Sequence, residues 1–153
     1  MTTTAPTLIR TAAFLKRWAP GLRHWKRAAL LNFVGWYWTD ARAGIVHDHG
    51  RIVAVALARC VSHLEQADAP YYHDETAPIV WVDDIVSRHP LGITLLLGQV
   101  RQRFGTREAF AGRVFNRDGE LRMLPFRVLE RFSQPPGDSH HGFTLYSSAT
   151  RAA

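Results

Sequence analysis

The chain has 153 residues, 46% of them hydrophobic, a length that suits one globular domain with a single core. No apolar run reaches the roughly 18 residues that span a bilayer, and a lone cysteine, Cys60, excludes an internal disulfide. The net charge of +6 predicts an anionic partner, but the basic residues are 17 arginines and 2 lysines scattered along the chain, which argues against nucleic acid.

Two helices are predicted first. Apolar residues at helical spacing predict a helix over 8–18, which the Ala-Pro-Gly segment 19–21 ends. A second helix is predicted over 22–38. Its apolar stripe is unusually aromatic and consists of Trp25, Ala29, Phe33 and Trp36, widened by Leu30, Val34 and Tyr37. We expect these rings to form core that covers a sheet, rather than a surface that stacks on a substrate.

A β-hairpin is predicted next, with arms at 44–46 and 51–61 and a His-Asp-His-Gly turn at 47–50. The turn would expose both of its histidines, and the apolar second arm would lie centrally in a sheet. The polar segment 62–77 is long for a loop without structure, so we expect it to contain a short helix or to bind something.

Two adjacent acids, Asp83 and Asp84, lie on a predicted strand over 78–86. Because strand residues alternate faces, the two carboxylates should point in opposite directions, and one should face an apolar layer. A carboxylate there costs several kcal/mol unless it is paired or hydrogen-bonded. The acids are therefore candidates either for chemistry or for structural pairing with Arg59 or Arg113 on neighbouring strands.

The rest of the chain alternates helices and strands. A helix is predicted from Pro90, which suits the first helical position, to Phe104, with Gly105 as its cap. The remaining elements are, in chain order, a strand at 107–115, a turn at 116–119, a helix at 120–132 that is either kinked at Pro125 or begins there, a loop at 133–141 and a strand at 142–147. One domain over 1–153 is expected, with flexible tails at 1–7 and 148–153.

The remaining polar clusters predict no metal site. His47 and His49 flank Asp48 in a turn, and although a His-x-His pair can chelate a metal, two exposed histidines at a turn tip usually do not. The set of His63, His73, Asp74 and Glu75, in or beside the polar connection, has no recognised ligand spacing. Cys60 ends an apolar strand and is expected to be buried rather than nucleophilic.

The order of these elements resembles the Gcn5-related N-acetyltransferase fold from about residue 8 to 147. The resemblance implies an α/β domain with a mixed, mostly antiparallel sheet and helices on both faces. In that family the turn after the strand at 78–86 holds the pyrophosphate of acyl-CoA on backbone N–H groups at a helix N-terminus, an arrangement that favours anions. It implies a cofactor site at Val86, Arg88, Gly92 and Asn116. The turn departs from the family's Arg/Gln-x-x-Gly-x-Gly/Ala pattern, because it has one glycine and a proline at position 90.

A second resemblance is to the toxin-activating lysine acyltransferases, a branch of this fold that takes its acyl group from acyl carrier protein. It rests on His24-Trp25 near the start of the second helix and on Trp81-Val-Asp-Asp84 on the later strand. The resemblance implies that His24 is a base or acyl acceptor and that Asp84 orients or polarises it. The arginines Arg88, Arg101 and Arg103 would meet the phosphates of coenzyme A or the acidic surface of the carrier protein.

The function expected from these resemblances is transfer of an acyl group from a thioester, acyl-CoA or acyl carrier protein, to an amine. Asp84, Asp83 and His24 are the candidate catalytic residues, and no metal is required. The alternative is a catalytically inactive module of the same fold that binds a protein or nucleic acid. The sequence leaves open whether the chain forms a homodimer. The N-terminus lacks the features of a secretory signal, so a cytoplasmic protein without a membrane partner is expected.

Overall fold

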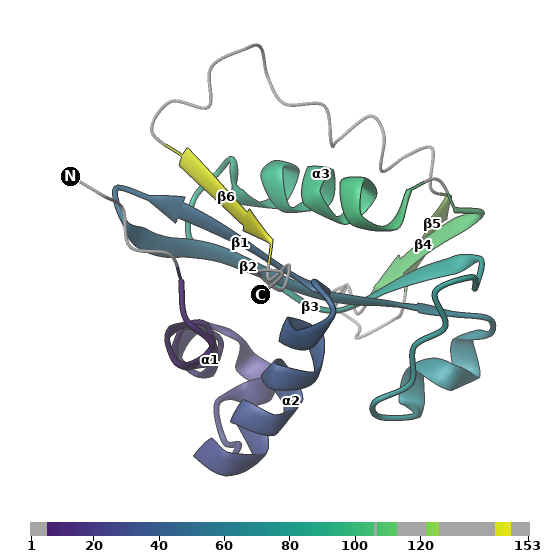
Figure 1. The fold of residues 1–153 in the computed structure, drawn as a ribbon, viewed down its shortest axis with the longest axis horizontal. Coiled ribbons are helices and arrows are strands. Elements are labelled where there is room, and N and C mark those ends of the chain that lie inside the picture. Colours follow the sequence, from purple (N-terminus) through teal and green to yellow (C-terminus); the bar gives the residue numbers. More distant parts are fainter. Residues whose placement is uncertain (1–5, 106, 113–121, 126–142, 148–153) are drawn as a thin grey trace.

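The computed structural model describes residues 6–105, 107–112, 122–125 and 143–147. Within them, six strands form one sheet in the order β5-β4-β3-β2-β1-β6, with helices on both faces (Figure 1). The strands are β1 (Ala43–Asp48), β2 (Arg51–Val61), β3 (Ile79–Ser87), β4 (Ala109–Gly112), β5 (Arg122–Pro125) and β6 (Phe143–Ser147). The helices are α1 (Leu8–Trp18), α2 (Arg27–Thr39), α3 (Gly92–Phe104) and two 3-10 helices, η1 (Pro20–Leu22) and η2 (Leu64–Asp68).

The sheet is mixed and mostly antiparallel, which confirms the expected fold class. Of the strand pairs in the described part of the chain, β3 and β4 alone are parallel, and α3 makes the connection between them. A parallel pair requires such a crossover, because a tight turn can join only antiparallel neighbours. Helix α3 packs on one face of the sheet through Leu95, Leu96, Val100 and Phe104.

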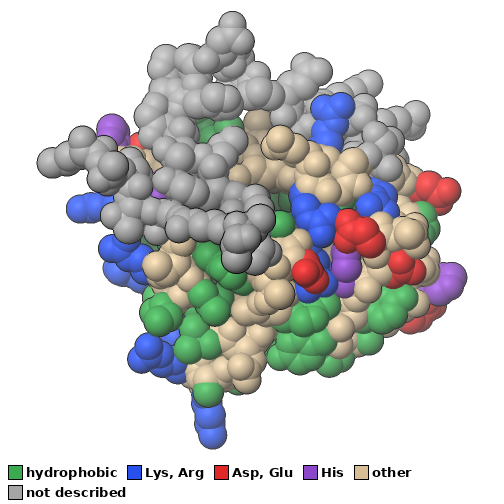
Figure 2. Space-filling model, in the orientation of Figure 1, with side chains coloured by type: hydrophobic (Ala, Val, Ile, Leu, Met, Phe, Trp, Pro, Cys, Tyr) green, Lys and Arg blue, Asp and Glu red, His purple; other side chains and the backbone are tan. Residues whose placement is uncertain are grey.

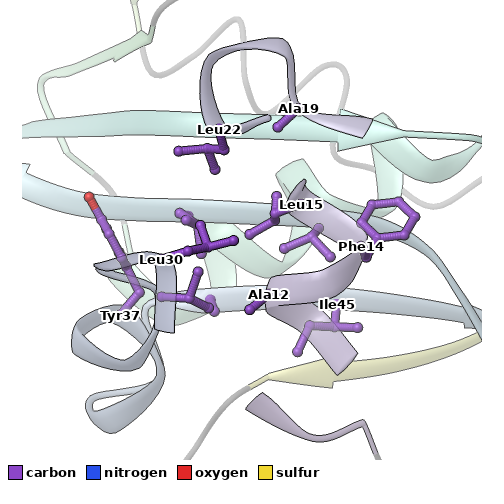
Figure 3. Close-up of a cluster of buried hydrophobic side chains, with 12 residues drawn as sticks. Ala12, Phe14, Leu15, Ala19, Leu22, Leu30, Tyr37 and Ile45 are labelled. Carbon is purple, nitrogen blue, oxygen red and sulfur yellow. The ribbon is translucent and has the colours of Figure 1, made fainter. Parts of the chain in front are cut away.

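Helices α1 and α2 cover the opposite face of the sheet and enclose the largest cluster of buried apolar side chains (Figure 3). Leu15 and Leu30 are buried there against Ile45 and other residues of β1 and β2. Tyr37 lies at the edge of the cluster, with its ring among the apolar side chains and its hydroxyl directed away from them. This face therefore combines a packed core with a polar group at its border.

The second helix begins later than the sequence pattern predicts. Residues 20–22 form η1, 23–25 are turns or bends, and α2 begins at Arg27. Pro20 suits the first position of a short helix, which ends before Lys26, the extended N-cap residue of α2.

The side of α2 that faces the core also differs from the prediction. Its buried residues are Leu30, Val34 and Tyr37, which the sequence placed at the edge of the stripe, whereas Trp25 is 36% exposed. Trp25 precedes the helix, so the predicted stripe began outside it. The expectation that the whole aromatic stripe is core is therefore wrong at Trp25.

The predicted hairpin is present, but its turn is shorter than expected. Strand β1 continues through His47 to Asp48, and the turn consists of His49 and Gly50, which both have positive φ angles, 51° and 79°. Two such residues suit the turn that best matches the twist of a hairpin. His47 is 1% exposed inside the strand, so the expectation that both histidines are exposed at the tip is wrong.

Other predictions have mixed outcomes. Of the two forms predicted for the helix at 120–132, the kinked one is wrong at 122–125, which form β5, and a helix that begins at Pro125 would continue outside the described residues. This strand pairs with β4 at the edge of the sheet, where Pro125 is tolerated because one side of an edge strand forms no ladder. The short helix expected within 62–77 is η2, and β6 confirms the last strand. The turn predicted at 116–119 and the loop at 133–141 lie outside the described residues.

Of the tails expected over 1–7 and 148–153, residues 1–5 and 148–153 lie outside the described residues. Thr7 caps α1, because its hydroxyl oxygen accepts the N–H of Arg10 at 3.1 Å. In the part of the chain that the structure describes, no helix is both long and apolar enough to cross a membrane.

The side of α2 that faces the core can be tested with two adjacent leucines. Leu30 is 2% exposed and Leu31 is only partly buried, so the substitution Leu30→Ala should lower the free energy of unfolding by about 2–5 kcal/mol. Leu31→Ala is the matched control and should lower it by clearly less. Urea denaturation of both variants measures the difference. Equal losses, or a larger loss for Leu31→Ala, would contradict the orientation of α2.

Candidate functional site

A β-bulge in β3 places Asp83 and Asp84 on the same face of the sheet. Leu57 of β2 pairs with Asp84 and Ala58 pairs with Val82, so Asp83 is an extra residue in β3. On either side of the two acids, Val82 and Ile85 pack toward α3. Both acids line one pocket on the α1–α2 side. The expectation that they point in opposite directions is therefore wrong, because the bulge interrupts the alternation of side chains.

The carboxylate of Asp83 is bonded on both of its oxygens. Arg59 Nε donates to Oδ2 at 2.8 Å and its Nη2 donates to Oδ1 at 3.2 Å. Trp81 Nε1 donates to Oδ1 at 3.0 Å, and the hydroxyl of Tyr37 donates to Oδ2. The side chains of Arg59 and Asp83 are 3% and 8% exposed. This confirms the structural alternative, pairing with Arg59; Arg113, the other partner considered, lies outside the described residues.

Arg59 also connects β2 to the polar segment 62–77. Its Nη2 donates to the carbonyl of Ala67 at 2.6 Å, and its Nη1 donates to the carbonyls of Ala69 at 2.7 Å and Tyr72 at 3.2 Å. A guanidinium has five N–H donors and no acceptor, so one buried arginine can satisfy a carboxylate and several carbonyls together. The position of η2 and of the residues after it therefore depends on the same side chain that holds Asp83.

Burial and charge keep the hydroxyl of Tyr37 protonated. Desolvation raises the pKa of this phenol well above its ordinary value, and the negative charge of Asp83 together with the hydrogen bond to it raises the pKa further. Tyr37 is thus a fixed hydrogen-bond donor at any ordinary pH. The Asp83 carboxylate, held by a charged and two neutral donors, is a structural group, which makes Asp84 the candidate for contact with a ligand.

A pocket of about 320 Å³ opens beside the bulge. Residues from the loop between α1 and α2, from α2, from β2, from η2 and the segment after it, and from β3 line it. They are Ala19, Pro20, Gly21, Leu22, Trp25, Phe33, Tyr37, Arg59, Ala67, Asp68, Pro70, Tyr71, Asp83, Asp84, Ile85 and Val86. Residues from five separate parts of the chain meet here, as is typical of small-molecule sites.

The structure brings only some of the predicted catalytic residues into this pocket. Asp83 and Asp84 line it, as does Val86, which the sequence assigned to a cofactor. His24 is exposed in the turn before α2 and is not among the lining residues, although its neighbour Trp25 is. Asn116, the remaining residue of the predicted cofactor site, lies outside the described residues.

The turn between β3 and α3 uses its backbone donors within the protein. The N–H of Arg88 donates to the carbonyl of Val53 at 2.7 Å, and that of His89 donates to Ser87 Oγ at 3.2 Å. The N–H groups of Leu91 and Gly92 donate to the ring Nδ1 and to the carbonyl of His89, at 3.1 and 3.0 Å. A pyrophosphate would have to replace these hydrogen bonds.

The surroundings of Arg88 and Gly92 are likewise structural. The guanidinium of Arg88 lies 3.8 Å from the ring centroid of Trp18 in α1, a cation–π contact. Gly92 is buried, and a Cβ atom on it would lie 1.9 Å from Ser87 Oγ and 2.9 Å from Ala54 Cβ. The absence of a side chain at Gly92 therefore allows α3 to begin close to the sheet.

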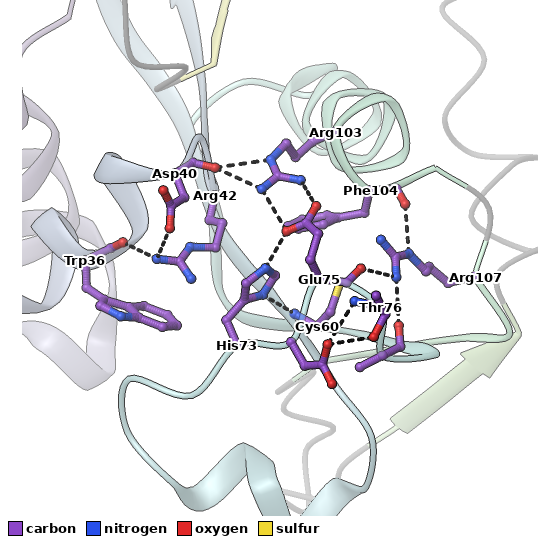
Figure 4. A network of polar contacts seen from close by, with 12 residues as sticks. Trp36, Asp40, Arg42, Cys60, His73, Glu75, Thr76, Arg103, Phe104 and Arg107 are labelled. Carbon is purple, nitrogen blue, oxygen red and sulfur yellow. Dashed lines mark hydrogen bonds and ion pairs between the residues drawn. The ribbon is translucent and has the colours of Figure 1, made fainter.

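A second polar network, which the sequence did not predict, lies at the end of α3 (Figure 4). Arg103 Nη1 donates to Glu75 Oε1 at 2.5 Å, and His73 Nε2 lies 2.6 Å from Glu75 Oε2. The Cys60 N–H donates to His73 Nδ1 at 2.9 Å, so the ring proton is on Nε2, between His73 and Glu75. The hydrogen bond from Arg103, followed by that from His73, lowers the pKa of Glu75 to about 2, and burial lowers the pKa of His73.

This network fixes the segment 73–75 rather than forming a reactive centre. Both nitrogens of His73 are bonded, and burial raises the pKa of the nearby Cys60 thiol to about 11, which disfavours a thiolate. Among the described residues, no group of three or more His, Cys, Asp or Glu side chains is placed to hold a metal ion.

Comparison with known proteins gives no family assignment. No protein-family model matches the sequence, and no curated protein or solved structure is significantly similar to it. The functional argument therefore depends on the site itself.

The structural role of Asp83 predicts a large effect of one substitution. Asp83→Asn leaves the buried charge of Arg59 without its counter-charge and should lower the free energy of unfolding by about 3–5 kcal/mol. Asp68→Asn, which neutralises an exposed acid of the same pocket, should change it by less than about 0.5 kcal/mol. Urea denaturation measures both. A small effect of Asp83→Asn would show that the pair does not support the bulge.

The tight contact at Gly92 gives a further prediction. Ser87 cannot move aside easily, because its hydroxyl donates to the His89 carbonyl at 2.6 Å, so Gly92→Ala should lower stability by about 1–3 kcal/mol. Gly21→Ala is the control, since a Cβ there has no heavy atom within 4 Å. Thermal or urea unfolding gives the comparison. A neutral or stabilising Gly92→Ala, as helix propensity alone would predict, would refute the packing role.

Proposed function

We propose that this protein is an acyltransferase of the Gcn5-related type that moves an acyl group from a thioester to an amine. The observation that carries the proposal is the bulge in β3, which lines the pocket with Asp84 while Asp83 is held by Arg59. A bulge takes main-chain groups out of the ladder and redirects side chains, and such features are frequent beside active sites.

The position of the bulge supports this function. The parallel ladder between β3 and β4 runs from Ile79 to Val82, which pairs with Gly112, the last residue of β4. The bulge follows immediately, and β3 continues to Ser87. A thioester that lies against this part of β3 would have its carbonyl oxygen near main-chain groups that can stabilise the negative charge of the intermediate.

The chemistry requires one nucleophile, one base and one leaving group. The amine nitrogen attacks the thioester carbonyl carbon, a C–N bond forms, and the C–S bond breaks to release the thiol. Asp84 takes the proton that the amine loses, and that proton can then pass to the thiolate. His24 lies on the same loop as Trp25, which lines the pocket, and it is a second candidate for this proton. Most of the remaining rate enhancement comes from holding the donor and the acceptor side by side.

The turn at 87–92 is evidence about which acyl donor the protein uses. Its bonded N–H groups and the stacking of Arg88 on Trp18 favour a donor that does not depend on a pyrophosphate held there. Acyl carrier protein is such a donor, and acyl-CoA is the other thioester to be tested.

The bonded N–H groups of this turn also favour a second candidate function. A protein of this fold in which the N–H groups of Arg88, His89, Leu91 and Gly92 are bonded within the protein could be catalytically inactive and could bind a protein or nucleic acid. The six cations of the first 39 residues, with no acid among them, are all exposed, and Figure 2 shows basic side chains along the side where Figure 1 places α1 and α2. Steeply salt-dependent binding to a generic duplex would indicate nucleic acid.

The assay that tests transfer measures the free thiol released from acetyl-CoA and from acylated carrier protein, with and without an added primary amine. We expect release that depends on the amine, and Asp84→Asn should lower it by about 10²-fold or more while the protein stays folded. His24→Ala reports whether the second candidate takes part. Glu108→Gln, an exposed acid outside the pocket, is the control.

Each outcome has a separate meaning. Release that is unchanged in both Asp84→Asn and His24→Ala would refute the assigned roles. No release from either donor, together with no donor-induced shift in melting temperature, would favour the inactive binding module. Bound donor at 100 times its dissociation constant should stabilise the fold by about 2.7 kcal/mol, so binding would be visible.

A further inference from the structure

A groove between α1 and the β1–β2 hairpin gathers arginines that are far apart in the sequence. Its volume is about 380 Å³, and Arg10 and Arg17 of α1 line it together with Arg51 at the start of β2. None of the described residues that line it is acidic, and it shares no lining residue with the pocket beside the bulge. Arginines that are scattered along the chain therefore form one basic surface in the folded protein.

One side of α1 faces this groove. Arg10, Ala13, Phe14 and Arg17 all line it, and their spacing of three, four and seven residues places them on the same side of a helix. The two arginines are two turns apart, which is about 10 Å along the helix axis. Ala13 is exposed between them, and its small side chain adds no bulk to the space that separates the two arginines.

The charges of the three arginines are not compensated by nearby acids. Arg10, Arg17 and Arg51 are exposed, and no carboxylate of the described residues forms an ion pair with any of them. Asp48, the cross-strand neighbour of Arg51, does not line the groove, and its Oδ1 lies 3.4 Å from His49 Nε2. Guanidinium groups bind the oxygens of phosphates in pairs, so the groove favours an anion with several charged groups.

A fourth arginine, from another part of the chain, adds to the positive potential of the groove. Trp18 lines the groove, and the guanidinium groups of Arg17 and Arg88 lie over its ring, 4.8 and 3.8 Å from the centroid. Because these two groups contact the ring, Trp18 offers little free surface on which a base could stack. A ligand in the groove therefore meets charge rather than an aromatic platform.

The apolar side chains of this region do not suit a protein or a membrane partner. Large apolar side chains that become buried on binding anchor protein interfaces, but Phe14 is only 9% exposed in the free protein. A helix that lies on a membrane needs a free apolar face, but that of α1 is buried in the core, and Ile9 is its one exposed large apolar residue. Interfaces with nucleic acid, in contrast, are polar and strongly basic.

We propose that this groove binds a single strand of nucleic acid through its phosphodiester backbone, without preference for base sequence. A duplex is usually bound by an element that projects into one of its grooves, whereas here α1 and the hairpin flank a hollow that can receive one backbone, as in other proteins that bind single strands. The inference does not depend on acyl transfer. It makes the second candidate function specific, because it names nucleic acid as the partner.

Fluorescence anisotropy of a labelled oligonucleotide measures this binding. The probe is fluorescein-labelled oligothymidylate of about 12 nucleotides, within the usual size of single-strand sites, titrated with the unaltered protein at several KCl concentrations. If three arginines each neutralise one phosphate, the logarithm of the binding constant should fall against that of the salt concentration with a slope of about −2 or steeper. Absence of binding at low salt, or a slope near zero, would overturn the proposal.

Two pairs of arginines with the same total charge provide the matched comparison. Arg10→Gln with Arg17→Gln, in the groove, should weaken binding by about tenfold or more and make the salt slope shallower by about 1.4. Arg23→Gln with Arg27→Gln removes two exposed arginines that do not line the groove, and it should weaken binding by less than about threefold. Equal weakening by the two pairs would mean that general charge, not the groove, attracts the strand.

Other anions test the identity of the partner. The probes are a duplex of the same length, a peptide of about 12 glutamates, and vesicles of phosphatidylserine and phosphatidylcholine, each at the same ionic strength. We expect all three to bind more weakly than the oligothymidylate. A duplex or an acidic peptide that binds as tightly, or protein that sediments with the vesicles and does not bind the oligothymidylate, would overturn the assignment to a single strand.

These results are separate from those of the acyl-transfer assay. Oligothymidylate binding without release of thiol from any donor would keep the groove and refute the acyltransferase. Amine-dependent release without oligothymidylate binding would keep the acyltransferase and refute the groove. Circular dichroism of each variant shows whether it is folded, and the salt dependence of the unaltered protein still tests the groove if a variant fails to fold.

Discussion

The buried ion pair between Arg59 and Asp83 is the interaction on which the site depends. Its two members lie on adjacent strands, and Asp83 is the extra residue of the bulge. A buried carboxylate in this position needs a counter-charge and several donors, and Arg59, Trp81 and Tyr37 supply them. The remaining donors of Arg59 hold carbonyls of η2 and of the segment after it, so one guanidinium positions both the strand and the loop beside it.

In this arrangement the two adjacent acids have different roles. Asp83 maintains the structure, and because the bulge turns Asp84 to the same face, Asp84 lines the pocket together with the rings of Trp25, Phe33 and Tyr71. The pocket thereby combines negative charge with aromatic walls in a protein whose first 39 residues are wholly cationic among their charged side chains.

Local sequence patterns predicted much of the fold. The helices at 8–18 and before Gly105, the hairpin, the strand with the two acids and the last strand all have periodicity and end signals within a few residues, and the structure confirms them. The helix over 120–132 was wrong where β5 forms, because pairing with β4 decides the conformation of 122–125 and leaves no trace in a short window. The later start of α2 accompanies η1, whose Leu22 is buried in the same core cluster as Leu30.

The site was predictable only in part. Adjacent acids on an apolar strand indicated where to look, and an arginine at position 59 within an apolar strand indicated a buried partner. The bulge was not predictable, because it is a property of the register between two strands, so the shared face of Asp83 and Asp84 could not be derived from alternation. Trp25 and Tyr71 were missed as pocket residues, because a single ring gives the same signal in a core as at a rim.

The most direct test of the account is a double-mutant cycle on Arg59→Met and Asp83→Asn, followed by urea denaturation. If the pair holds the bulge, each single variant leaves a buried charged or polar group without its partner, and the double variant should be less destabilised than the sum of the two. We predict a coupling energy of about 2–3 kcal/mol. A coupling energy near zero would show that Arg59 and Asp83 act independently and would contradict the claim that this pair organises the site.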